Sequence, residues 1–164
     1  MRKKLVLIIL FSCSVLTTNV MAGNKPVLKT GWMFIIQPET HYLFDAQLTG
    51  RYDFAGPFAF EYGGGFGINL NTFTSDVLLG GVLSFHKHDW EPYFRAAFLT
   101  KWIEKFKGPD ISDIALAATL SPGFSYKFKN GRSIGFDIAF EIGEIITHTK
   151  RFYWGMMPGM IFIF

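Results

Sequence analysis

The segment from Gly131 to Gly143, "GRSIGFDIAFEIG", alternates between large apolar residues and small or charged residues. Five large apolar residues share one face of an extended strand here: Ile134, Phe136, Ile138, Phe140 and Ile142. The intervening positions, which include Asp137 and Glu141, share the other face. A period of two residues is typical of a β-strand whose two faces meet different surroundings, and it excludes the 3.6-residue period of a helix.

The same alternation recurs in seven further segments, at residues 27–36, 42–52, 57–69, 75–87, 92–102, 114–128 and 152–164. Each is near the length of about 9–11 residues that a tilted strand needs to cross a membrane. The segment at 75–87 is the least clear, because both its faces carry aliphatic residues. Asn130-Gly131 is a strong hairpin signal between two of the segments. The pattern therefore predicts an all-β chain of eight antiparallel, up-and-down strands.

Residues 1–22 have the features of a cleaved signal peptide. Arg2, Lys3 and Lys4 precede a short apolar run, and "VMA" at 20–22 is a cleavage motif, so residues 23–164 form the predicted domain. The apolar run is too short for a membrane-spanning helix, which needs about 20 apolar residues. An alternative makes Cys13, in "LFSC", a lipidation site.

Removal of this segment changes what the composition implies. The whole chain has 16 basic and 13 acidic residues, so loss of the three basic residues leaves the remainder formally neutral. The basic character therefore belongs to the export signal, and we expect no nucleic-acid partner. Cys13 is the single cysteine and lies in the same segment, which excludes thiolate–zinc and cysteine-nucleophile chemistry from the domain.

The alternation alone leaves open which face of each strand meets water. A soluble sandwich or a lipocalin-type barrel would bury the phenylalanine-rich faces. However, the charged faces are also rich in Gly, Ala, Ser and Thr, which suits a narrow barrel interior. Aromatic residues gather toward strand ends, as the interfacial belts of a membrane barrel do: Trp32, Trp102 and Trp154 toward one end, Tyr52 and Tyr126 toward the other. We therefore predict an eight-stranded transmembrane β-barrel with its apolar faces toward lipid.

The carboxy-terminal stretch "GMMPGMIFIF" and the predicted hairpin at 121–140 resemble the small eight-stranded outer-membrane β-barrels of Gram-negative bacteria, typified by outer membrane protein X and the OmpA transmembrane domain. The resemblance implies an outer-membrane location with both termini in the periplasm, and contact with outer-membrane lipid and lipopolysaccharide. It also implies that the barrel-assembly machinery reads Phe164, Phe162 and Met160 as an insertion signal. A monomer is expected. The resemblance implies no particular activity.

Eight strands enclose an interior that side chains fill, so no wide pore is expected. The inward faces carry charges of both signs, among them Asp45, Glu61, Arg95, Lys101, Asp137 and Glu141. Counting positions from the inner rim predicts a cluster in which Arg95 lies between Glu61 and Asp137, and a second pair of Lys101 with Glu141. The favoured interpretation is that these charges fill the interior as pairs. An ion path through them is the alternative.

Few residues suggest chemistry. His41, Ser75 and Asp76 fall in predicted outer loops or beside them, and a rim-facing lipid-modifying enzyme, of the lipid A acyl hydrolase or acyltransferase type, would need such groups. His86 and His88 have no fixed third partner for a metal. We therefore expect no metal and no cofactor. A structural or surface-interaction role is the favoured interpretation, with the enzyme as the alternative.

Overall fold

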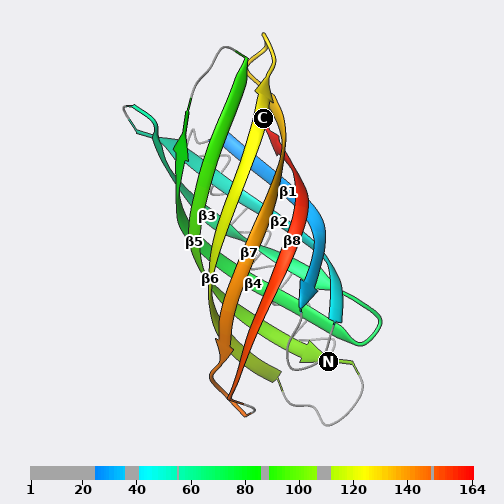
Figure 1. Cartoon of the computed structure of the whole chain (residues 1–164). Coiled ribbons are helices and arrows are strands. Elements are labelled where there is room, and N and C mark those ends of the chain that lie inside the picture. The colour runs from blue at the N-terminus through cyan, green and yellow to red at the C-terminus, as the bar shows by residue number, and fades with distance from the viewer. Residues whose placement is uncertain (1–24, 36–40, 55, 86–88, 107–111, 149) are drawn as a thin grey trace.

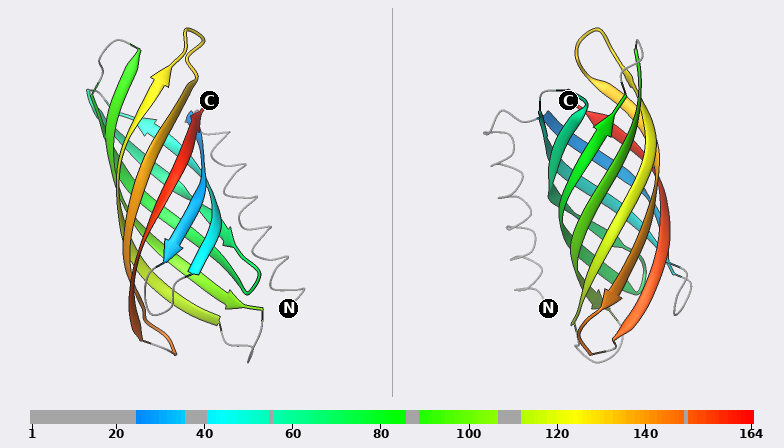
Figure 2. Two further views of the ribbon diagram at one scale, coloured as in Figure 1. Left: turned by 45° about the vertical axis from the view of Figure 1, so that its right-hand side comes forward. Right: turned by 60° about the vertical axis from the view of Figure 1, so that its left-hand side comes forward.

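The computed structural model describes residues 25–35, 41–54, 56–85, 89–106, 112–148 and 150–164, and the predicted signal peptide lies outside these ranges. They form eight strands: β1 (Lys25–Ile35), β2 (His41–Asp53), β3 (Phe58–Ile68), β4 (Thr72–Ser84), β5 (Trp90–Lys105), β6 (Ser112–Lys127), β7 (Ser133–Ile145) and β8 (Arg151–Ile163). Each strand pairs antiparallel with the next, and β8 pairs with β1 to close a barrel (Figures 1 and 2). The predicted fold class is confirmed.

The two ends of the barrel differ. Lys25, where β1 begins, lies at the same end as the C-terminus, at the top of Figure 1, and we call this the terminal end. The turn between β6 and β7 is also at this end and contains Gly131 at a φ of 84°, a conformation that favours glycine. The opposite end, where β1 ends and β2 begins, is the loop end.

Some predicted loops at the loop end are shorter than the sequence indicated. β5 and β6 each contain 16 residues, so their hairpin extends beyond the predicted strand ends at Trp102 and Ile114. β4 begins at Thr72, because the Asn69 side chain accepts hydrogen bonds from the backbone N–H groups of Asn71 and Thr72 and tightens the turn.

The seam between β1 and β8 explains why the chain ends in a bulky apolar stretch. The backbone N–H of Phe164 donates to the carbonyl of Pro26 over 3.0 Å, so the final residue is tied to the first strand. The register runs from Val27 with Ile163 to Gly31 with Gly159, and it resumes beyond Pro158. Proline has no N–H to donate, which accounts for the interruption. An open edge would leave such groups unpaired in hydrocarbon.

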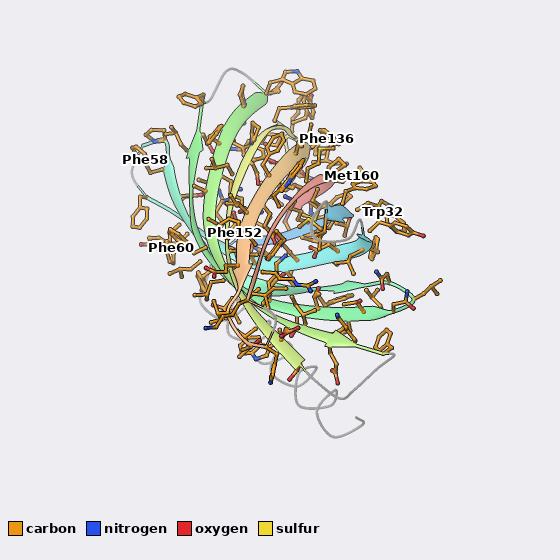
Figure 3. All side chains as sticks on the ribbon, turned by 60° about the horizontal axis from the view of Figure 1, so that its bottom comes forward. Trp32, Phe58, Phe60, Phe136, Phe152 and Met160 are labelled. Carbon is orange, nitrogen blue, oxygen red and sulfur yellow. The ribbon has the colours of Figure 1, made fainter. Side chains whose placement is uncertain are left out.

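The two faces of the wall have opposite chemistry. Large apolar side chains point outward, and Trp32, Phe58, Phe136, Phe152 and Met160 are between 39% and 60% exposed (Figure 3). Charged and small residues point inward, where Lys29, Glu61 and Asp137 are at most 2% exposed. The phenylalanine-rich faces therefore do not form a sealed core. The barrel is apolar outside, and its interior contains the charges together with smaller apolar clusters, an arrangement that fits a transmembrane barrel.

Candidate functional site

The interior charges form two groups. Near the terminal end, the terminal cluster comprises Lys29, Arg51, Glu61, Arg95 and Asp137. Nearer the loop end, the loop-end cluster comprises Asp45, Asp76, Lys101 and Glu141, each four positions in from the loop end of its strand. All nine residues are at most 5% exposed.

Lys29 and Asp137 form the most buried ion pair that the structure describes. The Nζ atom of Lys29 lies 2.8 Å from Oδ1 and 3.0 Å from Oδ2 of Asp137. The two residues come from β1 and β7, with β8 between them. Gly159 of β8 allows this contact, because a Cβ there would lie 3.3 Å from Cε of Lys29. The lysine side chain therefore crosses β8 at a position that has no side chain.

Glu61 is the centre of the remaining terminal cluster. Its carboxylate lies 3.4 Å from Nε of Arg95 and 3.7 Å from Nη2 of Arg51, and it accepts a hydrogen bond from the Thr49 hydroxyl. Arg95 also donates to Oε1 of Gln47 over 3.4 Å. Both arginines thus face one carboxylate, and a neutral hydroxyl binds its other oxygen.

The expected position of Arg95 between two carboxylates differs from this arrangement. Arg95 contacts Glu61, whereas Asp137 has Lys29 as its partner. The prediction counted positions along each strand and did not include the pairing of β8 with β1. That pairing places β1 close enough to β7 for their side chains to meet. The contact of Lys29 with Asp137 requires the alignment of β1 and β8, which the sequence pattern does not specify.

Lys101 and Glu141 lie together in the loop-end cluster. Nζ of Lys101 lies 2.7 Å from Oε1 and 2.9 Å from Oε2 of Glu141. The Tyr153 hydroxyl donates to Oε1 over 2.9 Å. The sequence analysis predicted pairs of acidic with basic side chains, so it did not include Tyr153, which lies on the inward face of the last strand.

Asp45 and Asp76 also point into the interior, at 1% and 5% exposure. Oδ1 of Asp45 and both oxygens of Asp76 have no hydrogen bond of good geometry among the described residues, although the backbone N–H of Gly65 lies near the Asp76 carboxylate as a weaker donor. Asp45 was expected in the interior. Asp76 was considered only as part of an alternative catalytic set.

That catalytic set is not assembled by the structure. Ser75 and Asp76 are neighbours in β4, so their side chains lie on opposite faces of the wall. Asp76 points inward, while Ser75 is on the outward face beside Phe66 and Trp102. The side chain of His41 lies outside the described residues, as do His86 and His88. A serine and an aspartate separated by the barrel wall cannot act on the same substrate atom.

The aromatic residues expected at the interfaces gather in groups at each end. Trp32 contacts Phe44 with ring centroids 5.6 Å apart, toward the loop end. Toward the terminal end, Tyr126 packs between Trp90 and Phe128, with centroid distances of 5.2 Å to each. Trp102, Trp154 and Tyr52 are 41–54% exposed on the outer surface, and Phe164 and Met160 of the expected insertion signal are also exposed there.

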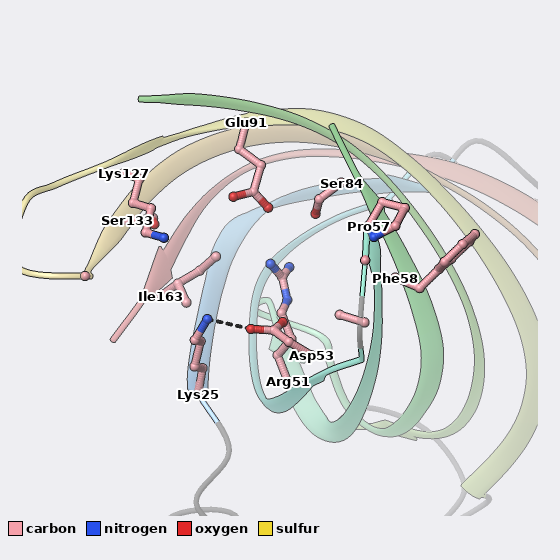
Figure 4. A pocket seen from close by; sticks show the side chains of 13 residues that line it. Lys25, Arg51, Asp53, Pro57, Phe58, Ser84, Glu91, Lys127, Ser133 and Ile163 are labelled. Carbon is pink, nitrogen blue, oxygen red and sulfur yellow. Dashed lines mark hydrogen bonds and ion pairs between the residues drawn. The ribbon is translucent and has the colours of Figure 1, made fainter. Parts of the chain in front are cut away.

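A small polar pocket of about 120 Å³ opens at the mouth of the terminal end (Figure 4). Lys25, Asp53 and Lys127 line its rim, and Lys25 forms an ion pair with Asp53. Arg51 lines the same pocket and contacts Glu61, so the terminal cluster adjoins the pocket. The pocket combines charges of both signs, which selects for no single class of ligand.

No three His, Cys, Asp or Glu side chains within the described ranges are grouped so that they could hold a metal ion. In the same ranges, no helix has the length and apolar character required to cross a membrane.

The fold defines the class of the protein: it is an eight-stranded antiparallel barrel of the type found in outer-membrane proteins. Among solved structures, the chain is similar to Neisserial surface protein A, with a TM-score of 0.74 and 11% identity over 86% of this chain and 96% of that one. It is also similar to the N-terminal β-barrel domain of Pseudomonas aeruginosa OprF, with a TM-score of 0.59 and 12% identity over 86% and 98% of the two chains.

A third similar structure is the outer membrane enzyme PagL, with a TM-score of 0.54 and 11% identity over 84% of this chain and 97% of that one. No protein-family model matches the sequence, and no curated protein matches it significantly. The similarity is therefore one of fold. It confirms the predicted resemblance to small outer-membrane barrels at that level.

Proposed function

We propose that the protein is an integral, monomeric barrel of the bacterial outer membrane, with a structural or surface-interaction role and an interior closed by paired charges. The observation that carries the proposal is the contrast between the two faces of the closed wall. The exposed outer face is a band of large apolar side chains, and the enclosed inner face is charged. Such a surface is stable in lipid, and lipopolysaccharide is among the lipids that it would contact.

Location and orientation are tested together. The predicted signal peptide would be removed after Ala22, and the terminal end would face the periplasm. An epitope inserted between β5 and β6 should be labelled on intact cells, whereas an epitope in the turn at 128–132 should be labelled only after the outer membrane is permeabilised. The reverse labelling pattern would exclude this orientation. Amino-terminal sequencing of the membrane-fraction protein checks the cleavage site.

Assembly through the last strand is a separate part of the proposal. The Phe164 side chain, 56% exposed, is available to the barrel-assembly machinery before the seam closes. Phe164→Ala should reduce the amount of heat-modifiable folded protein in the outer membrane. Phe140→Ala is a matched control, because Phe140 is 52% exposed in the middle of the wall. Equal loss in both variants would show a general effect of lipid-facing phenylalanine.

The structural role and the alternative enzyme role predict different measurements. Because paired charges fill the interior, the purified protein should form no steady conducting channel in a planar bilayer. Mass spectrometry of lipid A should show the same acyl chains with and without the protein. A change in lipid A acylation would favour the enzyme role. The position of Ser75 and Asp76 on opposite faces of the wall argues against that role.

A further inference from the structure

The loop-end cluster has an excess of negative charge. It contains three carboxylates, on Asp45, Asp76 and Glu141, and one cation, on Lys101. Both carboxylate oxygens of Glu141 contact Nζ of Lys101, at 2.7 and 2.9 Å, and Glu141 also accepts a hydrogen bond from Tyr153. The pair of Lys101 with Glu141 is therefore complete. Asp45 and Asp76 remain without an ion-pair partner in the part of the chain that the structure describes.

These two carboxylates are enclosed, which makes their lack of partners significant. Asp45 is 1% exposed and Asp76 is 5% exposed, and three of their four oxygen atoms have no hydrogen bond of good geometry among the described residues. The two groups also repel each other electrostatically. An ionised carboxylate is strongly unfavourable in an enclosed interior unless something neutralises it. Buried polar groups without partners commonly indicate an ion or water.

The strand between Asp45 and Asp76 has no side chain at the inward positions paired with them. Asp45 is on β2 and Asp76 is on β4, while the inward positions of β3 between them are Gly65 and Gly67. A Cβ at Gly67 would lie 3.2 Å from Oδ2 of Asp45 and 2.6 Å from the hydroxyl oxygen of Thr74. Asp45 of β2 and Thr74 of β4 therefore bring oxygen atoms together over Gly67, while the Gln47 side chain lies over Gly65, the position paired with Asp76.

We propose that Asp45 and Asp76 bind one hard divalent cation, such as Mg²⁺ or Ca²⁺, with the Thr74 hydroxyl as a neutral third ligand. The two carboxylates supply two negative charges, which matches the charge of the ion. The donor set is entirely oxygen, which suits these ions and not softer metals. Because no third carboxylate or histidine in the described ranges is in place, water completes the shell, as is usual for Mg²⁺.

The proposal is tested on protein refolded into detergent micelles free of lipopolysaccharide, since that lipid itself binds divalent cations. MgCl₂ and CaCl₂ are titrated after treatment with EDTA, with NaCl at equal ionic strength as the reference. The unfolding temperature of the wild-type protein should rise with either divalent salt and not with NaCl. Isothermal titration calorimetry should give one ion per barrel.

Asp76→Asn and Asp45→Asn should each weaken the measured affinity at least tenfold and remove the rise in unfolding temperature. Both variants should still fold, and in EDTA they should be at least as stable as the wild type, because repulsion between the carboxylates is relieved. Asp113→Asn is the matched control: Asp113 is a buried carboxylate nearer the loop end that accepts a hydrogen bond from Thr147, so its loss should leave binding unchanged.

Two results would overturn the proposal. A wild-type protein with no response to either divalent salt, together with variants that are more stable in every buffer, would show that the two carboxylates share a proton. Equal loss of binding in Asp113→Asn and Asp76→Asn would place the ion at the barrel rim.

Discussion

The two halves of the barrel interior differ in how their buried charges are neutralised. The terminal half contains more cations than carboxylates, and each of its carboxylates lies within 4.0 Å of a cation: Glu61 beside Arg51 and Arg95, and Asp137 beside Lys29. The loop-end cluster contains three carboxylates and one cation, and within it only Glu141 has an ion-pair partner. In the first arrangement every carboxylate has a cation beside it, although several buried polar atoms there also have no hydrogen bond, whereas the second leaves negative charge for a ligand to neutralise.

The difference indicates that the terminal half stabilises the closed barrel and that the loop half binds a ligand. Pairs in the terminal half join strands that are distant in sequence, since Lys29 and Asp137 connect the first strand to the seventh. Their removal should therefore weaken the closed barrel. Removal of charge from Asp45 or Asp76 should instead change binding and leave stability intact. The following predictions test this contrast.

The largest effect is expected for Lys29→Met, which leaves Asp137 ionised and without a partner at 0% exposure. Loss of one partner of a buried ion pair typically destabilises a protein by about 3–5 kcal/mol. The free energy of unfolding should fall by that amount, measured by urea titration of the detergent-solubilised protein. The double variant Lys29→Met with Asp137→Asn should recover part of the loss, because no bare charge remains. A single variant as stable as the wild type would show that the pair does not hold the two strands.

Arg95→Ala should have a smaller effect, because Arg51 continues to face Glu61 after the change. The substitution removes the contacts to Glu61 and Gln47. Loss of hydrogen bonds to a charged group typically destabilises by about 1.5–3 kcal/mol. The temperature at which the folded band converts to the unfolded band in gel electrophoresis should therefore fall. An unchanged conversion temperature would argue against a structural role for Arg95.

A pair of glycine substitutions compares the interior with the outer face. Gly67→Ala would place its Cβ 2.6 Å from the Thr74 hydroxyl and 3.2 Å from Asp45, so these side chains must move. Overpacking of this kind typically destabilises by about 1–3 kcal/mol. Gly81→Ala has open space outside the wall, where the nearest atom is 3.9 Å away, and should change stability by less than about 0.5 kcal/mol. Equal effects in urea titrations would mean that the space over Gly67 is not restricted.

The fold was predictable because the alternation with a period of two residues indicates where the strands lie. Segments such as β7 have one consistently apolar face, so strand number and the direction of each face follow from the sequence alone. The segment that became β4 was ambiguous because the interior also contains apolar side chains, such as Val82 in the terminal half and Leu78 toward the loop end. An aliphatic residue on an inward position cannot be distinguished from one that faces lipid by its type.

Contacts between distant strands could not be predicted in the same way. The partner of Asp137 depends on the register in which β8 pairs with both β1 and β7, and no local pattern specifies that register. The separation of Ser75 from Asp76, by contrast, was within reach of sequence reasoning. Adjacent residues of a strand always face opposite sides, and only the assignment of these two to a strand end obscured this.

The smallest effect is expected at the mouth of the terminal end, where Lys25 pairs with Asp53 (Figure 4). Their side chains are 53% and 45% exposed, so water already solvates both charges. Exposed ion pairs contribute about 0–1 kcal/mol, and salt screens them. Lys25→Met should therefore change the urea midpoint little at low salt and not at all in 1 M salt, a concentration at which the Debye length is about 3 Å. Lys29→Met is the same change at an enclosed ion pair. The ratio of the losses in unfolding free energy for Lys29→Met and Lys25→Met therefore measures how strongly the barrel wall shields a charge from water. Similar losses in both variants would mean that water reaches the terminal cluster, and that its pairs do not differ from surface pairs.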